Sequence, residues 1–128
     1  DGLDGVIGQL GDNAELAEGV MLLTPFAADA KDEKTQTFTA AYQEAYDGAT
    51  PNQFAADAYD AIYIIKAAIE QAEATPDMSV SDLCEALKVA MTEITVEGVT
   101  GTMTWDASGE PTKEPKAMVI KDGAYSAV

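Results

Sequence analysis

The sequence predicts an α/β fold, in which strands and amphipathic helices alternate along the chain. A continuous apolar run from Gly19 to Thr24, closed by Pro25, is typical of a strand buried on both faces in a parallel sheet. Apolar residues at helical spacing follow between about residues 33 and 91. The last third returns to the alternating, turn-punctuated pattern of strands.

Charge and size exclude several classes of partner. The 128 residues contain 23 acidic and 7 basic side chains and no histidine, which gives a formal net charge of -16. Such a surface repels nucleic acid and anionic membranes, because both are bound through clustered Lys and Arg. The apolar runs also fall far short of the roughly 20 residues that span a bilayer, so no membrane segment is predicted.

Two helices are expected before the middle of the chain. Leu3, Val6, Ile7 and Leu10 fall at helical spacing, with Asp1 as a possible N-cap and Gly11 as a stop. A second helix is predicted from about residue 33 to residue 46, with Phe38, Ala41, Tyr42 and Ala45 on one face.

The longest helix is predicted from about residue 50 to residue 72. Thr50 can cap it, Pro51 suits the first helical position, and Gln53 lies three residues after the cap. An apolar stripe runs along it and predicts that this face is largely buried: Phe54, Ala58, Ala61, Ile62, Ile65, Ala68, Ile69 and Ala72.

A further helix is expected from about residue 81 to residue 91, capped by Ser79 or Ser81. It holds the only cysteine, Cys84, whose apolar setting predicts a small buried hydrophobe. Strands are predicted at 102–105, 117–120 and 124–125, with turns at 106–109 and at Asp122-Gly123.

The residues for most catalytic chemistry are missing. Without histidine the chain cannot build a Ser-His-Asp triad, a Cys-His pair or a histidine metal site, and one cysteine excludes an internal disulfide. No phosphate-binding glycine loop follows a strand, and residues 29–33 lack the pattern of a calcium loop. We therefore expect no enzyme, no cofactor and no metal.

Several short motifs together resemble a known family. They are Asp1-Gly2-Leu3, Ala17-Glu18-Gly19-Val20, Thr24-Pro25-Phe26, Phe38 with Ala41-Tyr42, Tyr59-Asp60-Ala61, and Gly98-Val99-Thr100-Gly101-Thr102 with Trp105-Asp106 and Gly109. In order and spacing they are similar to the C-terminal portion of the type I periplasmic binding proteins. The leucine/isoleucine/valine-binding group of branched-chain amino-acid ABC transporters is the most similar branch.

The resemblance implies two flavodoxin-like lobes, each a parallel sheet flanked by helices, with the ligand in the cleft between them. Residues 1–25 and 116–128 would then belong to the second lobe and residues 26–115 to the first. The chain would cross between lobes near Pro25-Phe26 and near Pro111 to Pro115. The central strands of both sheets would lie upstream, so the chain is expected to self-associate or to need that upstream part.

The function implied is that of the extracytoplasmic solute-binding component of an ABC importer, which binds a small polar solute such as an aliphatic amino acid. Its partners would be that solute and the transporter's membrane subunits. The location would be periplasmic or extracellular, with or without a lipid anchor on an upstream segment. The alternative is a ligand-sensing domain of a receptor or regulator with the same fold.

Three residues are candidates for ligand contact by the same resemblance. Asp1 occupies the place of the acidic residue that pairs with the ligand's ammonium group, although it also suits the N-cap of the first helix. Phe54 occupies the place of an aromatic that lines the pocket, and is equally explained as core. Phe26, at a proposed crossing, would line the mouth of the cleft.

Overall fold

The computed structural model describes residue 3 and residues 5–128. In chain order the elements are α1 (Val6–Leu10), the 3-10 helix η1 (Gly11–Ala17), β1 (Met21–Thr24), α2 (Glu33–Ala45), α3 (Gln53–Gln71), α4 (Val80–Met91), β2 (Val96–Gly98), β3 (Gly101–Trp105), β4 (Pro111–Thr112), β5 (Lys116–Lys121) and β6 (Ala124–Ala127). None of the described helices is long and apolar enough to cross a membrane.

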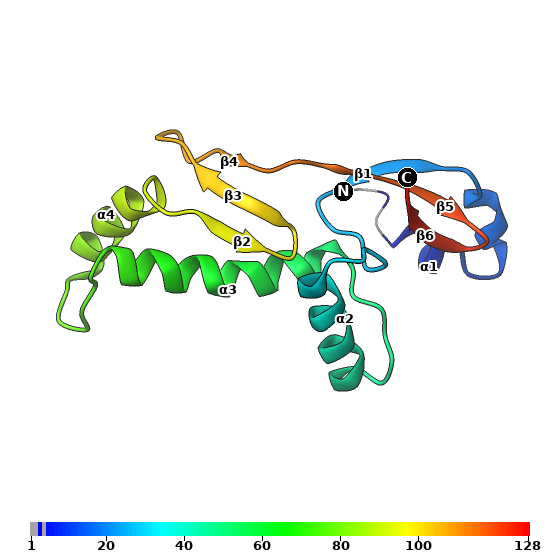
Figure 1. Ribbon diagram of the computed structural model, residues 1–128, viewed down its shortest axis with the longest axis horizontal. Coiled ribbons are helices and arrows are strands. Elements are labelled where there is room, and N and C mark those ends of the chain that lie inside the picture. Colours follow the sequence, from blue (N-terminus) through cyan, green and yellow to red (C-terminus); the bar gives the residue numbers. More distant parts are fainter. Residues whose placement is uncertain (1–2, 4) are drawn as a thin grey trace.

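Figure 1 shows that these elements form two groups beside each other. One group, here called the β1 body, consists of α1, η1, β1, β5 and β6. The other, the α3 body, consists of α2, α3, α4, β2, β3 and β4. Two segments join them: the first connection, residues 25–32, and the second connection, residues 113–115, which Figure 1 shows running along the upper edge of the molecule.

The β1 body is built on a three-stranded antiparallel sheet with the order β1-β5-β6. Met21 lies opposite Val119, and Ile120 lies opposite Tyr125. The turn predicted at Asp122-Gly123 is confirmed, since both residues have positive φ angles of 52° and 73° that suit a tight hairpin. The core of this body is small and consists of Ala17, Leu22, Ala27, Met118 and Ile120.

The strand predicted at residues 19–24 is present as β1, but its burial differs from the prediction. Met21 and Leu23 are 62% and 63% exposed, whereas Leu22 and Thr24 are buried. The expectation that this run is buried on both faces is therefore wrong for the described chain. Among the described strands β1 pairs only with β5, in an antiparallel ladder, and the alternation of exposed and buried residues along it shows that only one of its faces is covered.

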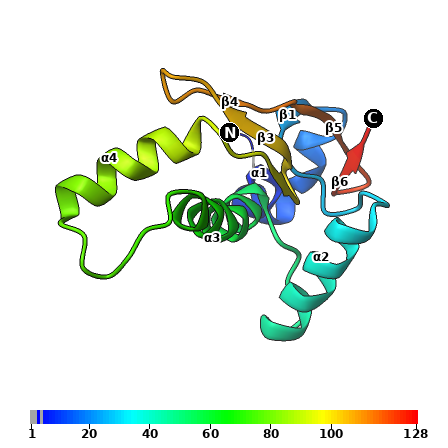
Figure 2. The same cartoon turned by 60° about the vertical axis from the view of Figure 1, so that its left-hand side comes forward.

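The α3 body is organised around its 19-residue helix. Figure 2 shows α2 and α4 extending from α3 to opposite sides, while the β2-β3-β4 sheet lies over α3. Two separate apolar clusters hold these elements together. One contains Ala68, Ala90, Ile94, Val96 and Met103, and the other contains Phe26, Phe38, Ala56 and Val99.

Side-chain caps begin three of the helices. Asp32 accepts from the amide of Thr35 at the start of α2, and Ser79 accepts from the amide of Asp82 at the start of α4, one of its two predicted caps. Asn52 caps α3 by accepting from the amide of Ala55 at 3.0 Å. The predicted cap, Thr50, is therefore wrong by two residues, because Asn52 offers an equally good acceptor closer to the helix.

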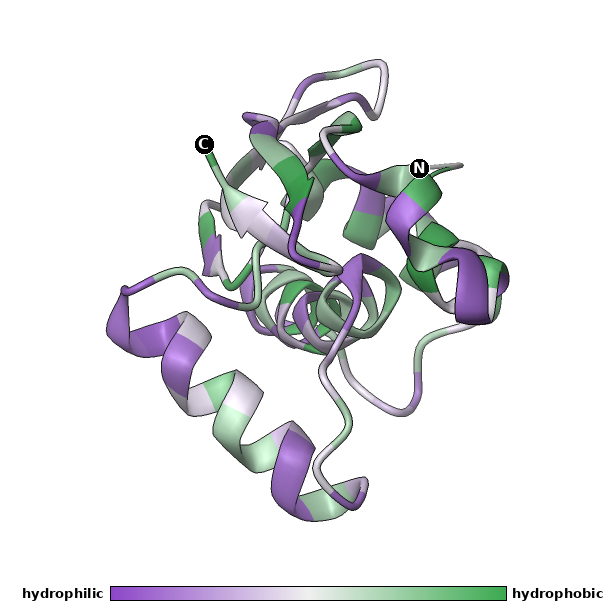
Figure 3. Ribbon diagram, turned by 90° about the vertical axis from the view of Figure 1, so that its right-hand side faces the viewer, coloured by the Kyte–Doolittle hydropathy of each residue, from purple (hydrophilic) through white to green (hydrophobic). Residues whose placement is uncertain are grey.

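The apolar stripe predicted to be the buried face of α3 is exposed over much of its length. Phe54, Ile62 and Ile65 are exposed, while Gln53, Ala56 and Asp60 are buried. The helix is apolar on more than one side, and β2 and β3 cover only the side that carries Asp60. Figure 3, which looks almost along α3, shows hydrophobic ribbon on this helix and on the strands above it.

The predicted stop of the first helix is confirmed, since α1 ends at Leu10 with Gly11 as its C-cap before the chain continues as η1. The predicted burial of the cysteine differs. Cys84 is exposed instead of buried, because α4 contacts α3 through Leu87, Ala90 and Met91.

Candidate functional site

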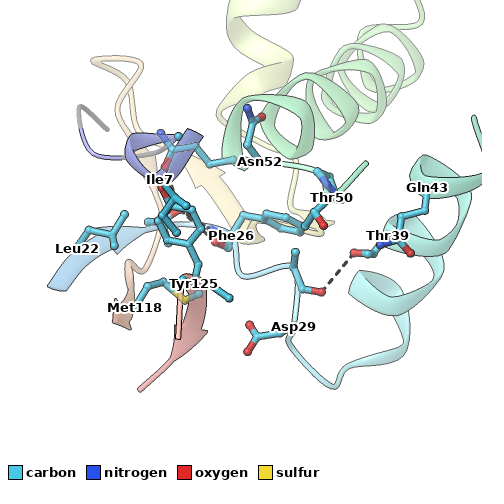
Figure 4. A pocket seen from close by; sticks show the side chains of 17 residues that line it. Ile7, Leu22, Phe26, Asp29, Thr39, Gln43, Thr50, Asn52, Met118 and Tyr125 are labelled. Atoms are coloured by element: carbon cyan, nitrogen blue, oxygen red, sulfur yellow. Dashed lines mark hydrogen bonds between the residues drawn. The ribbon is translucent and has the colours of Figure 1, made fainter. Parts of the chain in front are cut away.

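A cavity of about 600 Å³ lies between the β1 body and the α3 body. Figure 4 shows that its walls come from both, with Ile7, Leu22, Met118 and Tyr125 on one side and Thr39, Gln43 and Thr50 on the other. The lining residues are Gly5, Ile7, Leu22, Thr24, Phe26, Ala28, Asp29, Thr39, Gln43, Thr50, Pro51, Asn52, Gln53, Met118, Gly123, Ala124 and Tyr125.

Phe26 forms the apolar centre of this cavity wall. Its side chain is 4% exposed and belongs to the same buried cluster as Phe38. The two rings meet edge to face, with centroids 5.7 Å apart and an interplanar angle of 83°. This arrangement is favourable for aromatic pairs, so Phe26 is held in one orientation by the α3 body although it directly follows β1.

A buried hydrogen bond fastens the end of β1 to the start of α3 in the same wall. The Thr24 hydroxyl donates to Gln53 Oε1 at 2.9 Å, and the amide of Phe26 donates to the Thr24 hydroxyl at 3.3 Å. Thr24 and Gln53 are 5% and 3% exposed. The Thr24 side chain therefore fixes both the end of its strand and the first residues of the first connection.

Asp29 is the only charged side chain among the residues described as lining the cavity. Its Oδ2 accepts from the amide of Ala127 at 3.4 Å, which ties the first connection to β6. The remaining polar lining groups are hydroxyls and amides, including Thr39, whose hydroxyl donates to the carbonyl of Ala28 at 3.5 Å. The described wall can therefore receive a small molecule that has an apolar part and a few hydrogen-bonding groups.

Of the three residues predicted to contact the ligand, one lines the cavity, and that residue is Phe26. Phe54 directly follows Gln53, which lines the cavity, but its own ring is 54% exposed and is not among the lining residues. Asp1 lies outside the described residues.

Sequence reasoning missed Thr24, Gln53 and Asp29 as wall residues. Gln53 carried a usable signal, because it begins a row of polar residues, continued by Asp57 and Asp60, on an otherwise apolar helix. No comparable signal marks Thr24 or Asp29, since a strand-end threonine and a loop aspartate are common in any α/β protein.

An aromatic cluster extends from the cavity wall to the surface of α2 and α3. The Phe38 ring lies 4.8 Å from that of Tyr59, and the Tyr59 hydroxyl lies 3.2 Å from the Tyr63 hydroxyl. The pKa of Tyr59 is raised above its usual 10.0, mainly by the hydrogen bond with Tyr63 and to a smaller extent by burial. The Tyr59 phenol is therefore neutral at physiological pH, and the cluster acts as packing.

A second, smaller cavity of about 320 Å³ lies between α4 and the turn after β3. Trp105 and Met91 form part of its wall, and the turn at 106–109 closes it. The Asp106 carboxylate is occupied within that turn, since the Ser108 hydroxyl and amide donate to it at 2.6 and 2.8 Å. These bonds lower the pKa of Asp106, and the bond from the Ser108 hydroxyl contributes most to the shift. The Asp106 carboxylate therefore serves to stabilise the turn.

Comparison with known protein families decides the identity of the fold. Residues 2–124 match the family model described as periplasmic binding protein. The chain belongs to the periplasmic binding protein family. Members of this family are extracytoplasmic, non-enzymatic proteins that bind small molecules and work with ABC transporters, which agrees with the expectation that the chain is no enzyme.

Solved structures of periplasmic binding proteins share this fold. A candidate branched-chain amino acid ABC transporter from Rhodospirillum rubrum is 31% identical, with a TM-score of 0.66 over 95% of this chain and 34% of that chain. The branched-chain amino acid transporter substrate binding protein LivJ from Streptococcus pneumoniae, in complex with isoleucine, is 25% identical, with a TM-score of 0.77 over 99% of this chain and 34% of that one.

A third structure shows that the fold is shared more widely. The solute binding protein of an ABC transporter from R. palustris, in complex with benzoate, is 20% identical, with a TM-score of 0.75 over 98% of this chain and 32% of that one. No curated protein matches the chain in sequence. The chain spans about a third of the length of the solved structures it matches.

Proposed function

We propose that the chain is part of the solute-binding component of an ABC importer and that the solute is a small aliphatic amino acid. The observation that carries the proposal is the cavity of about 600 Å³ walled by both bodies. Its volume falls within the range of about 300–1,000 Å³ that is usual for small-molecule sites. The 31% identity to the candidate branched-chain amino acid ABC transporter supports the choice of solute.

The two bodies are proposed to belong to different lobes. Residues 1–25 and 116–128 would form part of the second lobe and residues 26–115 part of the first. The separate cores support this division, because Leu22 and Met118 share one cluster while Ala68 and Met103 share another. The cavity between them would then be part of the cleft that closes on the solute.

Three residues are proposed to contact the solute. The Asp1 carboxylate would accept hydrogen bonds from the ammonium group, since an amine removed from water needs a charged acceptor. Phe26 would contact the aliphatic part from the cavity wall. The exposed ring of Phe54, one residue beyond the wall, would reach the solute or the upstream part of the same lobe.

A thermal-shift screen of the full-length protein that carries this chain tests the proposal. The screen compares aliphatic amino acids with the corresponding carboxylic acids and with aromatic acids. A solute at about 100 times its dissociation constant adds about 2.7 kcal/mol of stability, which raises the melting temperature by several degrees.

We expect the shift with aliphatic amino acids and its loss in Asp1→Ala, with Glu70→Gln on the exposed face of α3 as the control. Shifts with acids that lack an amine would contradict the role of Asp1. Absence of any shift would contradict the proposed binding of a small amino acid.

A further inference from the structure

Three polar residues share one face of α3, and each of them bonds to a different, distant segment of the chain. Gln53, Asp57 and Asp60 are spaced i, i+4 and i+7, which places them one above another along the helix. Their partners are residue 24 at the end of β1, residue 113 in the second connection, and residues 99 and 100 in the turn between β2 and β3.

The first of these bonds fixes the first connection. Thr24 is the last residue of β1, and its hydroxyl donates to Gln53 Oε1 at 2.9 Å. Both side chains are buried, so breaking this bond would leave polar groups without a partner and out of reach of water, which costs free energy. The chain therefore leaves the β1 body at a point that is fastened to the first turn of α3.

The second bond fixes the second connection one helical turn further along. Lys113 Nζ lies 2.7 Å from Asp57 Oδ1, and the two side chains are 25% and 40% exposed. Lys113 directly follows β4, and three residues later the chain enters β5 in the β1 body. Both routes between the two bodies are thus held to the same end of one helix.

The third bond makes that helix a rigid support. Asp60 accepts from the amides of Val99 and Thr100 at 2.9 Å each, and from the Thr100 hydroxyl at 2.6 Å. The carboxylate is buried, and both of its oxygens accept hydrogen bonds from these donors. Because α3 is locked to the β2-β3 turn, a segment attached to Gln53 or Asp57 is attached to the whole α3 body.

We propose that Gln53 and Asp57 are positioning residues that restrict how the β1 body is oriented on the α3 body. The cavity has walls from both bodies, so this orientation sets its shape. If the proposed function holds, loosening either bond lowers the fraction of molecules in the binding-competent orientation, and the apparent affinity for the solute falls by the same factor.

The test measures orientation without any ligand. In the full-length protein, one spin label is placed on Cys84, which is exposed on α4, and a second at the thiol introduced by Val128→Cys, at a position that is 77% exposed directly after β6. Pulsed electron resonance then gives the distribution of distances between the two bodies. Other cysteines of the full-length protein are replaced by serine beforehand.

We expect Asp57→Asn and Lys113→Met each to broaden this distribution, and the double variant Asp57→Lys with Lys113→Asp to narrow it again. Thr24→Val, which keeps the side-chain shape but removes the donor to Gln53, should broaden it further, while Thr24→Ser keeps the hydroxyl and should restore it. The control is Glu70→Gln, which breaks the exposed Lys66–Glu70 pair of 2.7 Å on the same helix without touching either connection.

Solute affinity is measured on the same variants by titration calorimetry with L-isoleucine. It should fall about two- to fivefold in Asp57→Asn, as suits a partly exposed ion pair, and about tenfold in Thr24→Val, as suits a buried hydrogen bond. Unchanged distance distributions in Asp57→Asn and Thr24→Val would overturn the proposed positioning role. Broadened distributions in a protein that binds no solute would support that role and overturn the proposed function instead.

Discussion

Asp60 and Thr100 form a buried bidentate contact between α3 and the turn that joins β2 to β3. Thr100 donates both its amide, at 2.9 Å, and its hydroxyl, at 2.6 Å, to Asp60 Oδ2. The neighbouring amide of Val99 donates to Oδ1 at 2.9 Å. A buried carboxylate is tolerated here because both of its oxygens accept hydrogen bonds from donors in the turn.

Removal of this carboxylate should destabilise the α3 body. In Asp60→Ala the buried amides of Val99 and Thr100 lose their acceptor, which should lower the free energy of unfolding by about 3 kcal/mol. The matched control, Asp77→Ala in the exposed α3–α4 loop, should change it by less than about 0.5 kcal/mol. Urea unfolding of the full-length protein measures both. Equal effects would contradict the structural role given to Asp60.

Gly98 is required by the same contact. A Cβ atom at this position would lie 2.2 Å from Asp60 Oδ2, and the carboxylate cannot move away without breaking its bonds to the turn. Gly98→Ala should therefore cost about 1–3 kcal/mol of stability. Gly8→Ala, where the added methyl meets open space within α1, should be neutral or slightly stabilising. Identical melting temperatures for the two variants would refute this explanation.

The cap of α2 should make its stability depend on pH. The hydrogen bond from the amide of Thr35, assisted by the charge of Lys116, lowers the pKa of Asp32 below its usual 3.8. A lowered folded-state pKa stabilises the protein at pH values above the unfolded-state pKa, and this stabilisation is lost as the pH falls through the folded-state pKa.

Asp32→Ala should cost about 1 kcal/mol at pH 7, whereas Asp32→Asn, which keeps a capping oxygen, should cost less. The penalty of the alanine variant should shrink as the pH falls below the ordinary aspartate pKa and through the lowered folded-state pKa of Asp32, where the wild-type carboxylate loses its charge. Thermal melts at pH 7 and pH 3 measure this difference. A penalty of the same size at both pH values would argue against a charged cap.

The uncovered face of α3 predicts association of the isolated chain. Ile62, Ile65 and Ile69 are 67%, 53% and 40% exposed along one side of the helix. Sedimentation velocity of the 128-residue chain should show oligomers, and the double substitution Ile62→Gln with Ile65→Gln should reduce them. Val80→Gln on α4, at a position that is 78% exposed, should leave association unchanged. A sharply melting monomer would contradict the prediction.

Most helices could be predicted from the sequence, because the residues that begin and end a helix lie within a few positions of its ends. The apolar spacing of α4 and the Asp122-Gly123 turn were predicted correctly, and Ser79 was one of the two predicted caps of α4. The face on which α3 is buried was predicted wrongly, because the helix has apolar residues on both sides of its polar row. Which side is covered depends on strands that are distant in sequence, and periodicity carries no information about them.

The candidate site was predicted less completely. Phe26 was identified through the resemblance and lines the cavity, but the Thr24–Gln53 bond joins residues 29 positions apart and left no pattern in the sequence. The wall contribution of Asp29 likewise depends on how the first connection folds back on β6. Contacts of this kind join residues that are far apart in the sequence, and the spacing of residues along one chain does not predict them.

Titration calorimetry with L-isoleucine tests most directly whether the full-length protein containing this chain binds a small amino acid between its lobes. The wild type and Asp1→Ala are compared under the same conditions. We predict saturable binding of one molecule per protein, with a negative heat-capacity change from apolar burial, and at least tenfold weaker binding in Asp1→Ala. A folded protein that releases or absorbs no binding heat with isoleucine, leucine or valine at several temperatures would contradict the claim.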